Sequence, residues 1–296
     1  MIEEVLYEHL VENLRSTQYF ATWNGTVAVF NQEAPADTDP SWGSGSQYGR
    51  IVFMVDSSID PARKISSNLV VDVMCEKGKQ EPEVLEHVVR DLIDGYFFTQ
   101  DGDTMMAQWK TSNYFTEPNE KVIGVTISFN LLAFPQSETD EPDPVNLLNQ
   151  WSSEILAEAL GKEIKVIGYG DQLSSAWKPT TQNPAIYWRI SQIGKCAWIP
   201  DTYNVSWQDA TIQGHVFAAD VHMELKICRI IDNLLQQKEQ ILFSDGSPLF
   251  VDRNIRINTS NDPLRTGQIS VVGTYGLLRT YPQAPAIENI SLEMGS

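Results

Sequence analysis

The chain has 296 residues, of which 42% are hydrophobic and 10% aromatic, which is enough to form one large domain or two ordinary ones. Its 39 acidic residues outnumber the 21 basic ones and give a net charge of −18. A surface this acidic excludes tight binding of DNA, RNA or an anionic membrane through phosphate contacts.

Targeting and redox signals are weak. The chain has no apolar run of the ~18–20 residues that a membrane span needs, and its first residues are acidic where a signal peptide is basic. We therefore expect a soluble protein made in the cytosol. Cys75, Cys196 and Cys228 are far apart and odd in number, which favours buried reduced thiols over a disulfide framework, a zinc knuckle or a redox dithiol.

Hydrophobic spacing predicts a series of elements in the first half of the chain. In chain order we expect a helix over 2–14, strands over 26–30, 51–55 and 69–75, a helix over 84–93, a turn at Asp101-Gly102, and a strand over 123–131 that leads to Phe134-Pro135.

The second half repeats this order after an acidic, proline-containing linker over 136–144. We expect a helix over 147–159 with Asp143 as N-cap, strands over 164–167, 186–190 and 212–218, a helix over 225–235, a turn at Asp245-Gly246, and a strand over 269–278 that leads to Tyr281-Pro282.

The two halves can be aligned at several points. Ile93-Asp94 matches Ile231-Asp232, Val125 matches Val271, and the closing aromatic-proline pairs match at a slightly larger offset, as loop insertions would produce. In the same order, the expected strand over 51–55 takes the place of that over 186–190, and the strand over 69–75 takes the place of that over 212–218. The sequence thus predicts an α+β fold: two tandem copies of a mostly antiparallel sheet with two helices packed on one face.

The predicted division is a first module over 1–135, the linker over 136–144, a second module over 145–282 and a C-terminal tail over 283–296. Residues 1–144 hold 24 acids and 9 bases, whereas the remainder holds 15 acids and 12 bases. The modules would therefore present different electrostatic surfaces, by selection for two partners or by drift under a solubility constraint.

Candidate catalytic and metal-binding residues are scattered. His9 and His87 stand alone on predicted helices, and His215, Asp220 and His222 lack a recognised metal spacing. Asp101-Gly102-Asp103 lacks the rest of a calcium loop, and no phosphate loop or nucleophile elbow is present. We therefore expect no enzymatic activity, no cofactor and no metal.

Aromatic residues in or beside predicted loops are better candidates for contacts, although each could instead fold back onto its own sheet. They are Trp23, Trp42, Trp177, Trp198, Tyr203 and Trp207. We expect contact regions in the loops Asp37–Tyr48 and Gln172–Thr181 and in the tail after Pro282. The candidate interface residues are Asp37, Asp39, Trp42, Tyr48, Trp177, Trp207, Ile287 and Ile290.

The order of elements resembles the tail-terminator, or tail-completion, proteins of long-tailed bacteriophages. The second half carries the resemblance best, in its leading helix, the aromatic strand Pro184-Ala185-Ile186-Tyr187-Trp188-Arg189-Ile190, and the closing Leu277-Leu278 with Tyr281-Pro282. The first half departs at Gln47-Tyr48-Gly49, where the proline is missing. The similarity covers nearly the whole chain in order of elements, but the family has no catalytic signature.

This resemblance implies a structural virion protein that is assembled in the host cytoplasm. It would form a ring at the head-proximal end of the tail, end polymerisation of the tail tube and dock to the head-tail connector or stopper, while DNA passes through the lumen without tight binding. A duplicated chain would form the ring as a trimer with pseudo-sixfold symmetry or as a hexamer. Alternatives are a duplicated tube subunit or a head-tail stopper and, in another class, a carbohydrate-binding module or an enzyme that uses the aromatic loops.

Overall fold

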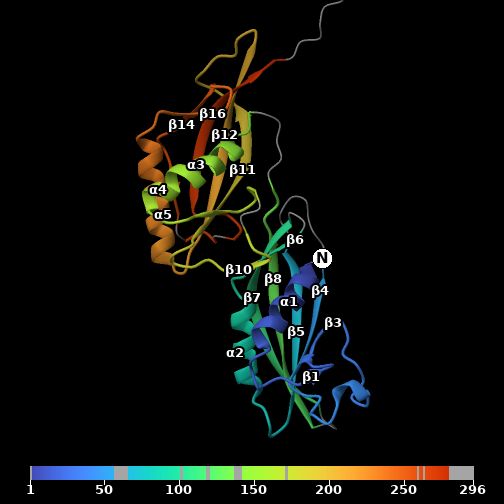
Figure 1. Cartoon of the computed structure of the whole chain (residues 1–296). Helices are drawn as coiled ribbons and strands as arrows, with labels where there is room; N and C mark the ends of the chain where they lie inside the picture. Colours follow the sequence, from blue (N-terminus) through green and yellow to red (C-terminus); the bar gives the residue numbers. More distant parts are fainter. Residues whose placement is uncertain are drawn as a thin grey trace, which may run out of the picture.

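The computed structural model describes residues 2–56, 66–100, 103–117, 121–136, 142–170, 173–258, 260–262 and 264–279. The fold is α+β and consists of two mostly antiparallel sheets, each with helices packed against it (Figure 1). Within the described residues no helix is long and apolar enough to cross a membrane.

The first sheet has the strand order β10-β6-β7-β8-β5-β4-β3, in which only β3 and β4 are parallel. Both helices of the first half pack on one face of this sheet and bury an aliphatic core. The elements are α1 (Ile2–Leu14), β1 (Thr22–Trp23), β2 (Thr26–Val27), β3 (Val29–Asn31), the 3₁₀ helix η1 (Pro40–Trp42), β4 (Arg50–Asp56), β5 (Ser66–Glu76), α2 (Pro82–Ile93), β6 (Phe97–Gln100), β7 (Asp103–Thr116) and β8 (Val122–Ala133).

The second sheet has the order β13-β14-β16-β12-β11-β9, with β15 also paired to β16, and only β9 and β11 are parallel. Its elements are α3 (Pro144–Trp151), the π-helical turn η2 (Ser152–Leu156), α4 (Ala157–Leu160), β9 (Lys165–Val166), β10 (Ala176–Trp177), β11 (Ala185–Lys195), β12 (Val205–Phe217), α5 (Val221–Gln236), β13 (Gln240–Leu242), β14 (Pro248–Val251), β15 (Arg256–Ile257) and β16 (Ile269–Leu278). The predicted N-cap is confirmed, because the Asp143 side chain accepts a hydrogen bond from Val145 N. At the other end of this helical segment, Gly161 ends α4 in the left-handed conformation.

The two strand orders correspond element by element once β10 and β15 are set aside. In each sheet a short edge strand, β3 or β9, lies parallel to its neighbour. The last strand of the first half, β8, lies between β5 and the β6–β7 hairpin, and the last strand of the second half, β16, lies between β12 and the β13–β14 hairpin. The predicted turn at Asp245-Gly246 is confirmed as the β13–β14 hairpin, with Gly246 at φ 82°. Asp101-Gly102 lies outside the described residues, although the flanking Gln100 and Asp103 are paired.

The strand pairing gives a register for the third strands. Val73 lies opposite Val125 in the first sheet, and Ile212 lies opposite Val271 in the second. On the predicted match of Val125 with Val271, Val73 takes the place of Ile212.

The preceding strand can be compared in the same way. On the same predicted match Ile51, which pairs with Val73, takes the place of Ile190, which pairs with Ile212. The parallel edge pairs give a different register, since Val29 lies opposite Ile51 and Val166 lies opposite Ile186. The register from the antiparallel strands aligns the segment 48–51, Tyr-Gly-Arg-Ile, with the segment 187–190, Tyr-Trp-Arg-Ile.

The two sheets meet at a junction that the predicted module boundaries do not anticipate. Strand β10 comes from the second half of the chain but pairs antiparallel with β6 at the edge of the first sheet, with Trp177 opposite Phe97 (Figure 1). Tyr187 Oη donates a hydrogen bond of 2.8 Å to Pro135 O, and Lys178 Nζ donates one of 2.7 Å to Asp94 O. A separate apolar cluster fills the contact and consists of Phe97, Leu132, Phe134, Ile167, Ala185, Tyr187, Phe217 and Leu264.

Phe97 is fully buried at this junction, so replacing it removes apolar contacts from both sheets. We expect Phe97→Ala to lower the free energy of unfolding by about 3–5 kcal/mol. Urea denaturation followed by circular dichroism measures the loss. Tyr114→Ala, at a side chain that is 52% exposed on the same sheet, is the control and should cost less than about 1 kcal/mol. Equal losses for the two variants would contradict the assigned burial.

His9 is a structural histidine on the inner face of α1. Its Nε2 lies 2.9 Å from Leu92 O and its Nδ1 lies 3.2 Å from Asn13 Nδ2, so the ring donates from Nε2 and accepts at Nδ1 as a neutral imidazole. Burial lowers the pKa of His9 below its ordinary value of 6.5, although the bond to Leu92 and the charge of Glu12 oppose the shift.

A lowered histidine pKa makes stability depend on pH in one direction. The contribution of His9 is present above pH ~6.5 and is lost as the pH falls through the lowered pKa, because the unfolded chain then binds the proton more strongly. We expect His9→Gln, which does not titrate, to lose less stability than the wild type between pH 7.5 and 5. Urea denaturation at several pH values tests this, with the exposed His87→Gln as control. Parallel pH profiles for wild type and His9→Gln would contradict it.

Candidate interaction surface

The predicted loop Asp37–Tyr48 folds onto its own module. Asp37 forms an ion pair of 2.5 Å with Arg50 and accepts a hydrogen bond of 2.7 Å from Tyr48 Oη. Partial burial opposes ionisation, but these two bonds and the Arg50 charge lower the pKa of Asp37. The Asp39 side chain caps η1 by accepting from Ser41 N. The polar residues of this loop thus hold its shape.

Trp42 is buried in that loop at 3% exposure, which leaves little of its side chain for a partner. Its ring lies 4.9 Å from the Trp23 ring and 5.8 Å from the Phe30 ring, and its Nε1 donates to Ala36 O. These three aromatic residues form a small cluster of their own beside the first sheet.

The remaining candidates lie in different places. Trp177 is half-buried on β10 at the junction between the sheets. Trp207 lies within β12, so the prediction that it belongs to a loop is wrong. Ile287 and Ile290 lie outside the described residues.

The titratable residues singled out from the sequence serve the fold. His215 is buried and accepts a hydrogen bond of 3.1 Å from Arg189 Nε, while Asp220 caps α5 through Met223 N. Within the residues that the structure describes, no cluster of three or more His, Cys, Asp or Glu side chains could hold a metal ion.

All three cysteines are buried and unbonded, as the sequence predicted. Burial raises the pKa of the Cys75 thiol to about 11 and that of Cys228 to about 12, so neither thiol ionises near neutral pH.

The structure exposes a different set of apolar side chains, at the end of the second sheet that points away from the first (Figure 1). Alternation along β12 and β16 places Val205, Trp207 and Leu278 on the face opposite the helices, since Val205 is paired with Leu278 and Trp207 with Gly276. Trp198, from the connection between β11 and β12, and Phe250, from β14, lie on the same face. We call these five residues the distal aromatic face.

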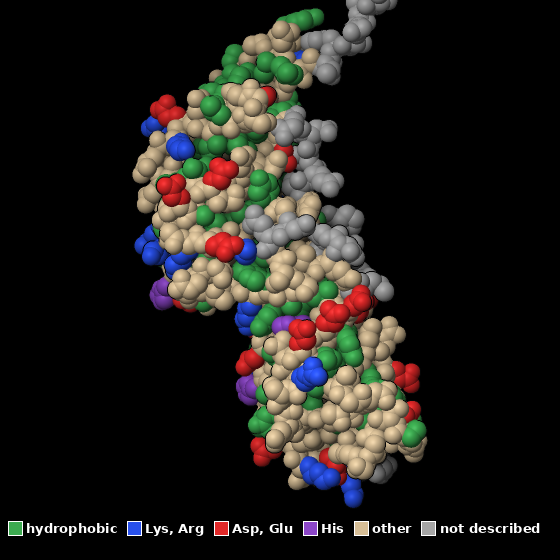
Figure 2. Space-filling view, in the orientation of Figure 1, with side chains coloured by type: hydrophobic (Ala, Val, Ile, Leu, Met, Phe, Trp, Pro, Cys, Tyr) green, Lys and Arg blue, Asp and Glu red, His purple; other side chains and the backbone are tan. Residues whose placement is uncertain are grey.

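The distal aromatic face is well packed internally and open to solvent. The Phe250 ring lies 6.0 Å from both the Trp198 ring and the Trp207 ring. Trp198 is nevertheless 63% exposed and Leu278 is 78% exposed. In Figure 2 apolar side chains gather over this end of the second body.

Glycine at position 276 leaves room for Val205. A Cβ atom there would lie 2.8 Å from Val205 Cγ1, which is too close, and 3.5 Å from the Trp207 ring, which is an ordinary contact distance. The small residue thus lets Val205 and Trp207 lie side by side against the backbone of β16.

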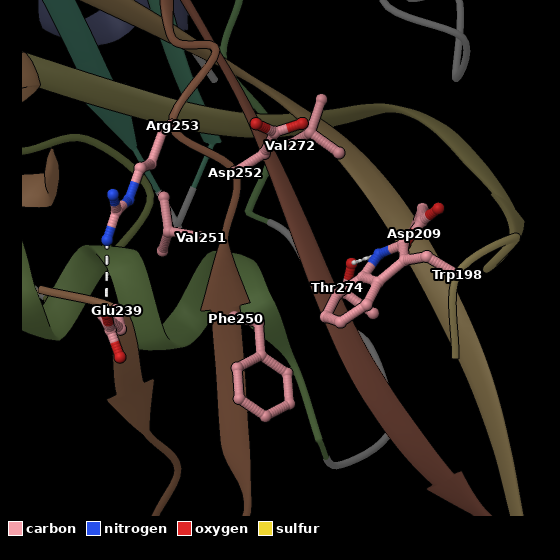
Figure 3. Close-up of a pocket in the computed structure, with 9 residues that line it drawn as sticks. All are labelled: Trp198, Asp209, Glu239, Phe250, Val251, Asp252, Arg253, Val272 and Thr274. Carbon is pink, nitrogen blue, oxygen red and sulfur yellow. Dashed lines mark hydrogen bonds and ion pairs between the residues drawn. The ribbon is translucent and has the colours of Figure 1, made fainter. Parts of the chain in front are cut away.

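A cavity of about 390 Å³ opens beside Trp198 and is bordered by charged groups (Figure 3). Trp198 Nε1 donates to Thr274 Oγ1 at 3.3 Å, and that hydroxyl donates to Asp209 at 2.5 Å. Arg253 forms an ion pair of 3.2 Å with Glu239 across the other side. Asp252 completes the polar border. The surface thus combines an aromatic platform with a rim that carries three carboxylates and one guanidinium.

This arrangement is that of a contact surface carried on a rigid sheet, with aromatic groups at its centre and charges at its rim. Neither a scan of family models nor a comparison with the sequences of curated proteins finds a match to this chain. The function therefore has to be argued from the fold and from this surface.

Trp198 and Trp188 offer a matched pair of tests for a surface role against a structural role. Trp188 is 1% exposed in the core and donates to Ser152 Oγ at 2.8 Å. We expect Trp188→Ala to lower the free energy of unfolding by about 3–5 kcal/mol, and Trp198→Ala to lower it by less than about 1 kcal/mol. Urea denaturation of both variants checks this. A loss of more than about 2 kcal/mol for Trp198→Ala would show that the main role of this side chain is to stabilise the connection between β11 and β12.

Proposed function

We propose that the protein is a self-assembling structural protein of a bacteriophage tail, which forms the ring at the head-proximal end of the tail and ends growth of the tube. The observation that carries this proposal is the distal aromatic face, because an apolar surface of this kind at the end of a sheet is costly to leave in water. The order of elements that resembles tail-terminator proteins supplies the particular role.

The second support is the correspondence between the two sheets. Equal strand order, the same parallel edge pair and the aligned segments 48–51 and 187–190 fit one ancestral module that has been duplicated in tandem. If each module takes the place of one subunit, three chains close a ring with pseudo-sixfold symmetry, whereas six full chains make a true hexamer.

The charge distribution fits a ring through which DNA passes. The first module carries most of the excess acid, and carboxylates on the wall of a channel repel a phosphate backbone and so prevent adhesion. The partners in this proposal are further copies of the chain, the tail-tube protein and the head-tail connector or stopper.

A tube subunit and a head-tail stopper remain alternatives within the same class. A carbohydrate-binding module is the second class, and the cavity beside Trp198 favours it, because an exposed indole next to carboxylates can stack on a sugar ring and accept hydrogen bonds from its hydroxyls.

Purified protein should form closed rings in negative-stain electron microscopy, with a mass by light scattering of three or six chains. Long tubes formed by the protein alone would favour the tube subunit. A monomer at all concentrations would contradict the proposal.

A further inference from the structure

The junction inside the chain suggests what covers the distal aromatic face. Leu132 of β8 and Leu278 of β16 occupy corresponding positions, because each lies seven residues beyond one member of the predicted pair Val125 and Val271, on the face of its sheet opposite the helices. Leu132 is 8% exposed, since the second module packs over it, whereas Leu278 is 78% exposed. The same apolar end of the sheet is therefore covered in the first module and uncovered in the second.

The cover at the junction comes from one defined part of the second module. Tyr187, at the start of β11, packs on Phe134 with ring centroids 5.2 Å apart, and Phe217, at the end of β12, packs on Phe97 at 5.2 Å. Strand β11 occupies the place in the second sheet that β4 occupies in the first, and Tyr48 lies just before β4 as Tyr187 lies at the start of β11. The equivalent part of the first module is therefore the end that points away from the second.

This end of the first module is exposed, partly aromatic and basic. Tyr19 is 48% exposed, and Gln80 Nε2 donates to the carbonyls of both Tyr19 and Tyr48, at 3.1 and 3.3 Å. Lys77 and Lys79 lie in the adjoining turn, and the Lys77 amide bonds to Lys121 O at 2.8 Å. We call the two tyrosines and three lysines the basic end.

Each of the two surfaces carries an excess of one sign of charge. At the basic end Lys77, Lys79 and Lys121 are exposed and one of them, Lys79, is paired with Glu76 at 2.8 Å; Figure 2 shows Lys or Arg side chains at this end of the first body, with an acidic side chain between them. The distal aromatic face is bordered by the carboxylates of Asp209, Glu239 and Asp252 and by Arg253, which is paired with Glu239. Such opposite rims favour one orientation of docking and penalise contact between two acidic surfaces.

We propose that the distal aromatic face of one copy binds the basic end of the next copy, so that the junction within each chain is repeated between chains. This inference rests on the proposed function, whose ring it supplies with an interface. The contact joins two different surfaces, so each copy offers one of each, and the assembly closes into a ring where the rotation per chain allows it.

Two variants that each disable one surface test the proposal. Trp198→Ala with Leu278→Asp disables the distal aromatic face, and Lys77→Glu, Lys79→Glu and Lys121→Glu together disable the basic end. We expect each variant alone to be a monomer by light scattering, with an unchanged circular dichroism spectrum. An equal mixture of the two should form a dimer of one copy each, because one intact surface of either kind remains.

The controls match the changes in charge and hydrophobicity. Lys110, Lys226 and Arg229 are exposed elsewhere, and their combined substitution by Glu alters the net charge equally but should leave assembly intact. Val221→Asp, at a side chain 63% exposed at the start of α5, is the control for adding a carboxylate at an exposed apolar site. Assembly of the wild type should weaken as the salt concentration is raised about tenfold, from about 0.05 to about 0.5 M, because salt screens the attraction between the charged rims.

The outcomes separate the two proposals. A wild type that forms rings while both surface variants also form rings would overturn this interface and leave the proposed function standing. A basic-end variant that still dimerises by itself would show a two-fold contact between distal faces and would also overturn it. A monomeric wild type would contradict the proposed function, and Trp198-dependent binding of soluble oligosaccharides by that monomer would assign the face to carbohydrate.

Discussion

The two bodies of this protein are joined by aromatic side chains that neither body buries alone. Phe97 and Phe134 extend from the end of the first sheet, 5.5 Å apart, and the second module encloses them with Tyr187 and Phe217. The one strand that the second half adds to the first sheet, β10, has only two residues but also satisfies backbone groups of β6 that an edge strand would otherwise leave to solvent. An apolar sheet end that must be covered is thus the constraint from which the rest of the arrangement follows.

Much of the fold could be predicted because its signals are local. The helices show the spacing of a buried stripe, the caps Asp143 and Gly161 mark their boundaries, and the long strands alternate between buried and exposed residues. Strand β10 could not be found in this way. Two residues in a polar loop have no period, and their pairing with β6 depends on a segment nearly eighty residues away.

The sequence leaves the register between the two third strands open, and the reason is physical. A shift by one residue turns every side chain to the opposite face of the sheet, but a shift by four returns each to the same face. Leu69 and Val73 are both fully buried and both aliphatic, so either matches Ile212 in character. Only the pairing with β8 and β16 distinguishes them, and pairing is a property of the folded sheet.

The exposure of the side chains in the candidate interaction surface could not be predicted from the sequence either. Trp42 and Trp198 each lie two residues from a proline in a connection between strands, yet one is 3% and the other 63% exposed. The difference arises because Trp23 and Phe30 enclose Trp42, whereas Trp198 lies on the rim of an open sheet end. Nothing in the sequence indicates that Phe250 and Leu278 are on the surface, since apolar residues in strands are most often core residues.

The uneven distribution of charge narrows the ways in which copies of this chain can meet. With 24 acids and 9 bases in residues 1–144, two first modules placed side by side would repel each other over most of their surface. The lysines at 77, 79 and 121 gather at one end, so attraction to an acidic rim is confined to that end. Apolar area supplies the free energy of such a contact, but the charges decide its direction, and together they favour a head-to-tail order over a symmetric pair.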